Sequence, residues 1–142
     1  MRIRYSEHVW LVETYFDPEA WYEELRDLPR GYEPPGGEIL LGRLDGQPAG
    51  CVLMRRLGED VCEMKRLFVA TAARGHHLGY RLCEAIVAVA RERGYRLMRL
   101  DVGFKQPEAK KLYSRLGFVP ISAYYDLPAP VVDLMDFMEL EL

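Results

Sequence analysis

A short basic segment, residues 74–79 (Arg-Gly-His-His-Leu-Gly), has the residue types and the position of an anion-binding turn. It follows an apolar, strand-like run at residues 64–69 and opens a helix-like run at residues 78–93. The first backbone N–H groups of a helix have no intrahelical partners and lie at the positive end of the helix dipole, so they can bind a phosphate. Because a basic turn with glycines is also common in plain loops, the segment alone leaves both interpretations open.

A second segment, residues 106–118, predicts a short helix with a tyrosine on its apolar face. Pro107 suits the first turn of a helix, and Gly117 suits the position just after its end. The apolar residues between them recur at helical spacing, namely Ala109, Leu112, Tyr113 and Leu116. A new strand is expected to start at Phe118.

The order of these two motifs resembles the GNAT superfamily of acyl-coenzyme A N-acyltransferases, and the resemblance extends over residues 38–142. The first family motif is Gln/Arg-x-x-Gly-x-Gly/Ala. Arg74, Leu78 and Gly79 fit it, and His77 stands where a glycine is usual. The second motif, Ala-x-x-Leu-Tyr-x-x-x-Gly-Phe, is matched in full, with Gln106 where an asparagine often precedes it.

The resemblance implies a single α/β domain over residues 1–142, with a mixed, mostly antiparallel twisted sheet, a central parallel strand pair and flanking helices. It implies acetyl-CoA as the acyl donor, with backbone groups of the strand end binding the pantetheine arm and turn amides binding the pyrophosphate. The expected cofactor-binding residues are Leu67, Phe68, Val69, Arg74, Gly75, His76, His77, Leu78, Gly79, Gln106 and Lys110.

Two residues are candidates for proton transfer. Glu63 lies eleven residues before Arg74, where some family members carry a general base, and a carboxylate facing a partly dry cleft could accept the proton of an attacking ammonium. The alternatives are a surface glutamate on an edge strand, or His76 or His77 as the base. The resemblance implies that Tyr113 protonates the departing thiolate, although its spacing alone would also suit a core residue.

The net charge of −3 is unevenly distributed. Residues 62–117 contain twelve Lys or Arg and five acids, a balance of +7, which leaves −10 for the remainder. A basic centre suits a polyanionic donor, and an acidic remainder suits a small cationic amine. A solvated basic helix face is the plainer alternative. The expected acceptor-binding residues are Tyr32, Glu33, Tyr124, Tyr125 and Asp126, with Trp21 and Tyr22 as further candidates.

Other functions stay open. The acceptor could be a protein N-terminus or a lysine, and the chain could be a non-catalytic acyl-CoA binding or sensing module. We expect a cytoplasmic protein with no nucleic-acid or membrane partner and no metal, and a homodimer is left open. Three cysteines, Cys51, Cys62 and Cys83, lie in apolar patterns and are expected to be reduced core residues.

The sequence also predicts the elements that position these groups. A strand is expected around Ile3 and Tyr5, with helices at residues 8–16 and 18–28. A hairpin turn at Asp45 and Gly46 joins strands 38–44 and 48–56. The remaining expected strands are 61–69, 97–102, 118–125 and 134–142, with 97–102 parallel to 61–69 and the last two paired antiparallel. A helix is expected at residues 78–93, and its apolar face is formed by Leu78, Leu82, Ala85, Ile86 and Val89.

Overall fold

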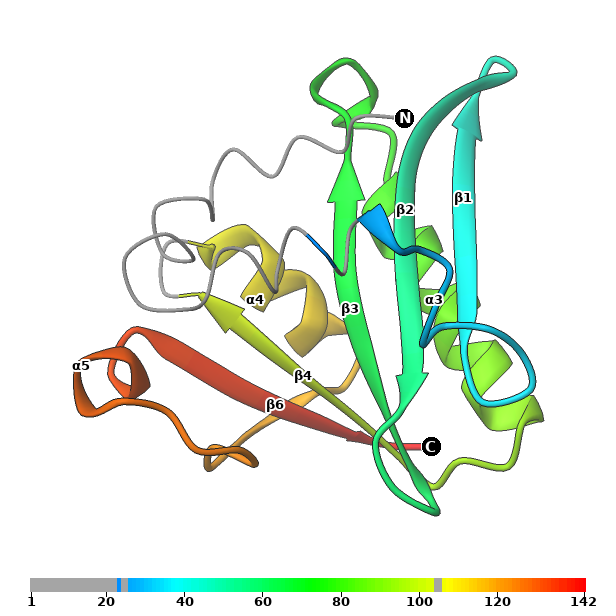
Figure 1. Cartoon of the computed structure of the whole chain (residues 1–142). Helices are drawn as coiled ribbons and strands as arrows, with labels where there is room; N and C mark the ends of the chain where they lie inside the picture. Colours follow the sequence, from blue (N-terminus) through cyan, green and yellow to red (C-terminus); the bar gives the residue numbers. More distant parts are fainter. Residues whose placement is uncertain (1–22, 24–25, 104–105) are drawn as a thin grey trace.

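The computed structural model describes Glu23, residues 26–103 and residues 106–142. These residues form a six-stranded sheet in the order β1-β2-β3-β4-β6-β5, with helices packed on it (Figure 1). The strands are β1 Glu38–Leu44, β2 Gln47–Arg56, β3 Val61–Val69, β4 Leu97–Gly103, β5 Val119–Ile121 and β6 Met135–Glu141. The helices are α3 Leu78–Glu92, α4 Pro107–Arg115 and α5 Ala129–Val132, with a short 3₁₀ turn at Thr71–Ala73. The expected mixed α/β architecture is confirmed.

The β1–β2 hairpin turns at the two residues that the sequence indicated. Leu44 pairs with Gln47, and both turn residues have positive φ, 51° at Asp45 and 78° at Gly46. This conformation matches the twist of the flanking strands, and an Asp-Gly pair adopts it at little cost. The strand after the turn starts at Gln47, one residue earlier than predicted.

β3 and β4 form the expected parallel pair, but only at their starts. Three register pairs join them, Val61↔Leu97, Cys62↔Met98 and Glu63↔Arg99. β3 then continues to Val69 and β4 to Gly103, and the two strands diverge (Figure 1). Among the described residues, the edge of β3 that faces β4 therefore has no strand partner beyond Glu63.

β3 also carries a bulge on its other edge. Cys51 pairs with Phe68 and Leu53 pairs with Lys65, so β3 holds one residue more than β2 over this stretch. Arg66 lies within it with a φ of 54°, a left-handed conformation that a bulge accommodates. The bulge bends β3 in the stretch where it has left β4.

The main core lies on the face of the sheet that α3 and α4 cover. α3 buries Leu82, Cys83, Ile86, Val87 and Ala90 against it. The predicted apolar face of this helix was partly wrong, because Ala85 is exposed and the buried face is rotated toward Cys83 and Val87. The sheet approaches the helix closely, since a Cβ added at Gly42 would lie 2.9 Å from Leu78 Cδ1.

The C-terminal region differs most from the prediction. The expected strand 118–125 is only three residues long, and the chain leaves the sheet after Ile121. Pro120 has no N–H to donate, which suits a short edge strand. Pro128 then precedes the unpredicted helix α5. The expected antiparallel pairing of the last two strands is confirmed, and β6 inserts between β5 and β4.

The expected strand at Ile3 and Tyr5 and the helix at residues 8–16 lie outside the described residues. Of the second expected helix, the structure describes Glu23 and Arg26 as helical, whereas Asp27 and Leu28 already lie in a turn, so the predicted end at residue 28 was too late. In the part of the chain that is described, no helix is both long and apolar enough to cross a membrane.

An arginine at the end of α3 binds the loop that leads into β1. Arg93 Nη1 donates to the carbonyl oxygens of Pro35, at 2.7 Å, and Gly37, at 2.9 Å. Its Nη2 donates to Glu38 Oε2 at 2.8 Å. This use of both terminal nitrogens requires the planar fork of a guanidinium.

We predict that Arg93→Lys lowers the free energy of unfolding by about 1–2 kcal/mol, because one ammonium cannot reproduce the three contacts. Urea denaturation measures the change. The matched control is Arg91→Lys, an exposed residue in the last turn of α3, which should change stability by less than about 0.5 kcal/mol. Equal stability of the two variants would contradict a clamping role for Arg93.

Candidate active site

A row of alternating charges crosses four strands on the face of the sheet opposite the main core. Its members are register neighbours: Arg55 pairs with Glu63, Glu63 with Arg99, and Arg99 with Glu139. Side chains alternate between the faces of a strand, so the neighbours of these residues supply the core while the charges share the other face. Arg99 Nε donates to Glu139 Oε2 at 2.8 Å.

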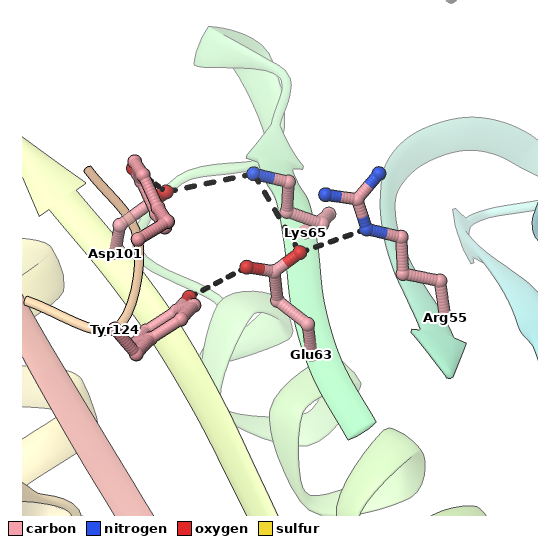
Figure 2. Close-up of polar contacts among 6 residues, drawn as sticks. Arg55, Glu63, Lys65, Asp101 and Tyr124 are labelled. Atoms are coloured by element: carbon pink, nitrogen blue, oxygen red, sulfur yellow. Dashed lines mark hydrogen bonds and ion pairs between the residues drawn. The ribbon is translucent and has the colours of Figure 1, made fainter. Parts of the chain in front are cut away.

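Glu63 is the buried member of this row, with a relative exposure of 1%. Its Oε1 accepts from Arg55 Nε at 2.8 Å, and its Oε2 accepts from the Tyr124 hydroxyl at 2.6 Å (Figure 2). Lys65 Nζ lies 3.9 Å from Glu63 Oε1 and 3.5 Å from Asp101 Oδ2. Glu63 is therefore not a surface residue on an edge strand, and both of its oxygens have donors, as a buried carboxylate requires.

Two tyrosines of the segment after β5 bind carboxylates of the central strands. Tyr124 binds Glu63, and the Tyr125 hydroxyl donates to Asp101 Oδ2 at 2.5 Å. Burial, followed by the negative charges of Asp101 and Glu63, raises the pKa of both phenols above the ordinary value of 10. Both hydroxyls are consequently protonated donors at neutral pH.

The other residues expected to bind the acceptor lie in different environments. Tyr32 is 2% exposed and packs with Cys51 and Leu53 in a small second core. Glu33 is exposed and accepts from the Gly31 N–H at 2.8 Å, and Asp126 is exposed. Trp21 and Tyr22 lie outside the described residues.

The turn before α3 has the conformation of an open helix start. Gly75 has a φ of +88°, and a Cβ there would meet no atom within 4 Å. His77 is the N-cap residue with a φ of 57°, and α3 begins at Leu78 without an acidic side chain in its first turn. The side chain of His77 caps no amide. Arg74 and His76 are exposed in the same turn. The positive end of the helix is thus not neutralised by a carboxylate of its own first turn.

α4, the helix that carries Tyr113, packs beside this helix start through Leu112. A Cβ added at Gly79 would lie 3.3 Å from Leu112 Cδ1 and 3.5 Å from Val69 Cγ2, so the start of α3, the end of β3 and α4 meet here. Tyr113 is 7% exposed, and its ring lies 5.8 Å from that of Phe118. Its membership of the main core does not exclude a reactive hydroxyl, because such a tyrosine can present its tip at the rim.

The remaining expected cofactor residues lie on β3 and on α4. Leu67 packs on the main core and Phe68 on the second core. Phe68 is the register partner of Cys51, so its backbone faces β2, and the backbone groups of Leu67 and Val69 alternate with it along the chain. Gln106 is the N-cap residue of α4. Lys110 Nζ lies 2.8 Å from Asp136 Oδ2, so its ammonium is paired with β6.

The cysteines show no sign of nucleophilic activation. All three are free and buried, and burial raises the pKa of Cys62 and of Cys83 to about 12. The thiols of Cys62 and Cys83 are therefore protonated at neutral pH. Within residues 26–103 and 106–142, no group of three or more His, Cys, Asp or Glu side chains is arranged to hold a metal ion.

The acetyltransferase (GNAT) family model matches residues 3–118 of this chain. The chain belongs to this family. An uncharacterised N-acetyltransferase of Schizosaccharomyces pombe is 37% identical over 122 residues, which are 84% of this chain and 73% of that protein.

Solved structures agree with this membership. A Klebsiella pneumoniae structure assigned to the acyl-CoA N-acyltransferases has a TM-score of 0.73 at 33% identity, and the match covers 97% of this chain and 91% of that one. A GNAT acetyltransferase of Elizabethkingia anophelis, solved with acetyl-CoA bound, has a TM-score of 0.64 over 89% of this chain and 84% of that one. At 18% identity, this second likeness shows the fold alone.

The sequence did not single out four residues around Glu63, namely Arg55, Lys65, Arg99 and Asp101. One signal could have found them. Glu63 and Lys65, like Arg99 and Asp101, are charged residues two positions apart in strands whose intervening residues are apolar. Charges repeated on one face of two central strands of a GNAT sheet indicate a polar site on that face.

The conformation of His77 gives a stability prediction for the turn. Because φ is 57°, glycine should be accepted without strain, and His77→Gly should change the free energy of unfolding by less than about 0.5 kcal/mol. His77→Val should cost about 1–3 kcal/mol, since a β-branched residue is strained there. Thermal unfolding of the two variants checks this. A valine variant as stable as the glycine variant would mean that the turn adopts another conformation.

Proposed function

We propose that this GNAT protein transfers an acetyl group from acetyl-CoA to a primary amine by direct attack on the thioester. The observation that carries the proposal is the divergence of β3 from β4 directly after Glu63. Among the described residues, it leaves the β4-facing edge of β3 without a strand partner beyond Glu63, and this edge runs from a buried carboxylate toward the turn at residues 74–79. A donor bound along this edge would have its phosphates at one end and its acyl group near the carboxylate.

The described residues fit such a donor. Of the three expected residues, Leu67 and Val69 would pair their backbone groups with the pantetheine arm, as a neighbouring strand otherwise would, whereas those of Phe68 face β2. Amides of the turn at residues 74–79 would bind the pyrophosphate, helped by the exposed Arg74. Gln106 would contact the donor from the start of α4. Lys110 would do so only by leaving Asp136.

Each proton transfer has a candidate residue. Acetyl-CoA, when bound, supplies the acetyl group as an activated thioester. Glu63 would accept the proton that the ammonium must lose before its nitrogen can attack, either directly or through a water. Tyr113 would donate its phenolic proton to the sulfur as the carbon–sulfur bond breaks, so the thiolate leaves as a thiol.

The acceptor class follows from charge. We expect a small cationic amine, because the donor phosphates would occupy the basic segment and the remainder of the chain is acidic. The exposed carboxylates of Glu33 and Asp126 are the candidates for attracting it. Release of free coenzyme A from acetyl-CoA, measured against a panel of amines, tests the activity itself.

Tyr113→Phe removes one hydroxyl and little packing. We predict that kcat falls about 100-fold or more while the affinity for acetyl-CoA is unchanged, as for a positioned acid. The measurements are steady-state kinetics and calorimetric titration. The control is Tyr95→Phe, which also removes a buried hydroxyl, one that donates to the Gly36 carbonyl oxygen at 2.6 Å. It should reduce stability and leave kcat unchanged. Equal kcat values for the two variants would assign Tyr113 to the core alone.

The acceptor preference should depend on salt. We predict that diamines have a higher kcat/KM than anionic amines such as aspartate, and that the advantage shrinks as ionic strength rises, since potentials act over about 8 Å at physiological salt. The combined change Glu33→Gln and Asp126→Asn should reduce it. Glu84→Gln, an exposed residue of α3 on the other face of the sheet, should leave it unchanged. A preference for anionic amines that salt does not alter would contradict the cationic acceptor.

A further inference from the structure

Tyr124 was expected to contact the acceptor, but its hydroxyl is directed at another group. It donates to Glu63 Oε2 at 2.6 Å, the shortest contact that this carboxylate makes among the described side chains. Figure 2 shows the phenol and the Arg55 guanidinium approaching Glu63 from opposite sides, one on each carboxylate oxygen. The carboxyl plane is thereby fixed by two donors from different parts of the chain.

We propose that Tyr124 is a positioning residue that orients Glu63 and stabilises its charged form for proton transfer. The inference rests on the proposed function, since it gives Tyr124 a role in the same reaction. The hydroxyl acts through the carboxylate and need not touch the acceptor. A hydrogen bond to the charged form of a group favours that form.

The ring of Tyr124 is held firmly enough for this role. It packs edge-on against Tyr125 and Phe137, with centroids 5.2 Å and 5.4 Å away, and the rings of Tyr125 and Phe137 lie 5.2 Å apart. The guanidinium of Arg99 lies 5.6 Å from the centre of the Tyr124 ring. A hydrogen-bond donor that is locked by such packing orients the carboxylate without a large loss of entropy when the substrate binds.

Other charged groups also face this carboxylate, and they define the control. Arg55 comes from β2, Lys65 from β3 itself, Arg99 and Asp101 from β4, and Tyr125 from the same segment as Tyr124. Tyr125 matches Tyr124 closely, because it lies in the same aromatic group and is half-buried like it. Its hydroxyl, however, donates to Asp101. Replacing either tyrosine with phenylalanine removes one phenolic donor and keeps the ring.

The experiment compares Tyr124→Phe with Tyr125→Phe in the full chain. For Tyr124→Phe we expect kcat to fall about 10- to 100-fold, with acetyl-CoA affinity unchanged. The acidic limb of its pH–rate profile should move to higher pH, because a carboxylate that has lost a donor keeps its proton to a higher pH. For Tyr125→Phe the limb should stay at the wild-type position. A limb that moves equally in both variants, or in neither, would overturn the inference.

A double-mutant cycle with Glu63→Gln separates positioning from direct contact with the acceptor. If Tyr124 acts through the carboxylate, Tyr124→Phe should lower kcat by less than twofold in the Glu63→Gln background. An equal loss in both backgrounds would mean that the hydroxyl acts on the acceptor, and would overturn the inference while the wild-type activity stands. A wild-type protein that acetylates no amine would instead refute the proposed function, and this inference with it.

Discussion

A buried carboxylate in a central strand is the constraint on which this site depends. Glu63 is 1% exposed, and an ionised carboxylate at that depth is strongly unfavourable unless opposite charge and hydrogen-bond donors surround it. Arg55 on the neighbouring strand and Tyr124 from the far end of the chain provide them. The hydrogen bonds that this one carboxylate requires therefore connect β3 to β2 and to the segment after β5.

The same requirement explains why the row of alternating charges crosses four strands. Arg99 is the register neighbour of Glu63 and binds Glu139 on β6, while Lys65 lies between Glu63 and Asp101. Each charge in the row has one of opposite sign beside it, so no single member is left without compensation. Such networks are more sensitive to the loss of one member than isolated surface pairs are. The other face of the sheet is free to be an apolar core under α3 and α4.

Local patterns predicted the parts of the fold that local chemistry decides. The Asp45-Gly46 turn, the helix from Pro107 and the strand of Glu63 are each specified by residues close together in sequence, and the structure has them nearly where the patterns indicated. The predicted apolar face of α3 included Ala85, which is exposed, and left out Cys83 and Val87, which are buried.

The contacts of the site depend on strand order, which no local pattern contains. Tyr124 is 61 residues from Glu63, and they meet because β6 lies between β4 and β5 and the chain leaves the sheet after Ile121. Tyr124 and Tyr125 were placed in a longer strand that ended at residue 125, so the early end of β5 was missed. Pro120 was the available signal, since it weakens the ladder at this edge.

A carboxylate that already accepts two hydrogen bonds can still act on a substrate. The two oxygens of an ionised carboxyl group offer about four acceptor positions, and Arg55 and Tyr124 use one on each oxygen. With respect to the described side chains, about two positions therefore remain for an incoming ammonium or for a water that relays its proton. The fixed donors hold the group in one orientation before the amine arrives, and an ionised carboxylate attracts an ammonium at short range. The structural role of Glu63 in the sheet and its proposed role as a base are thus compatible, because they use different lone pairs of the same group.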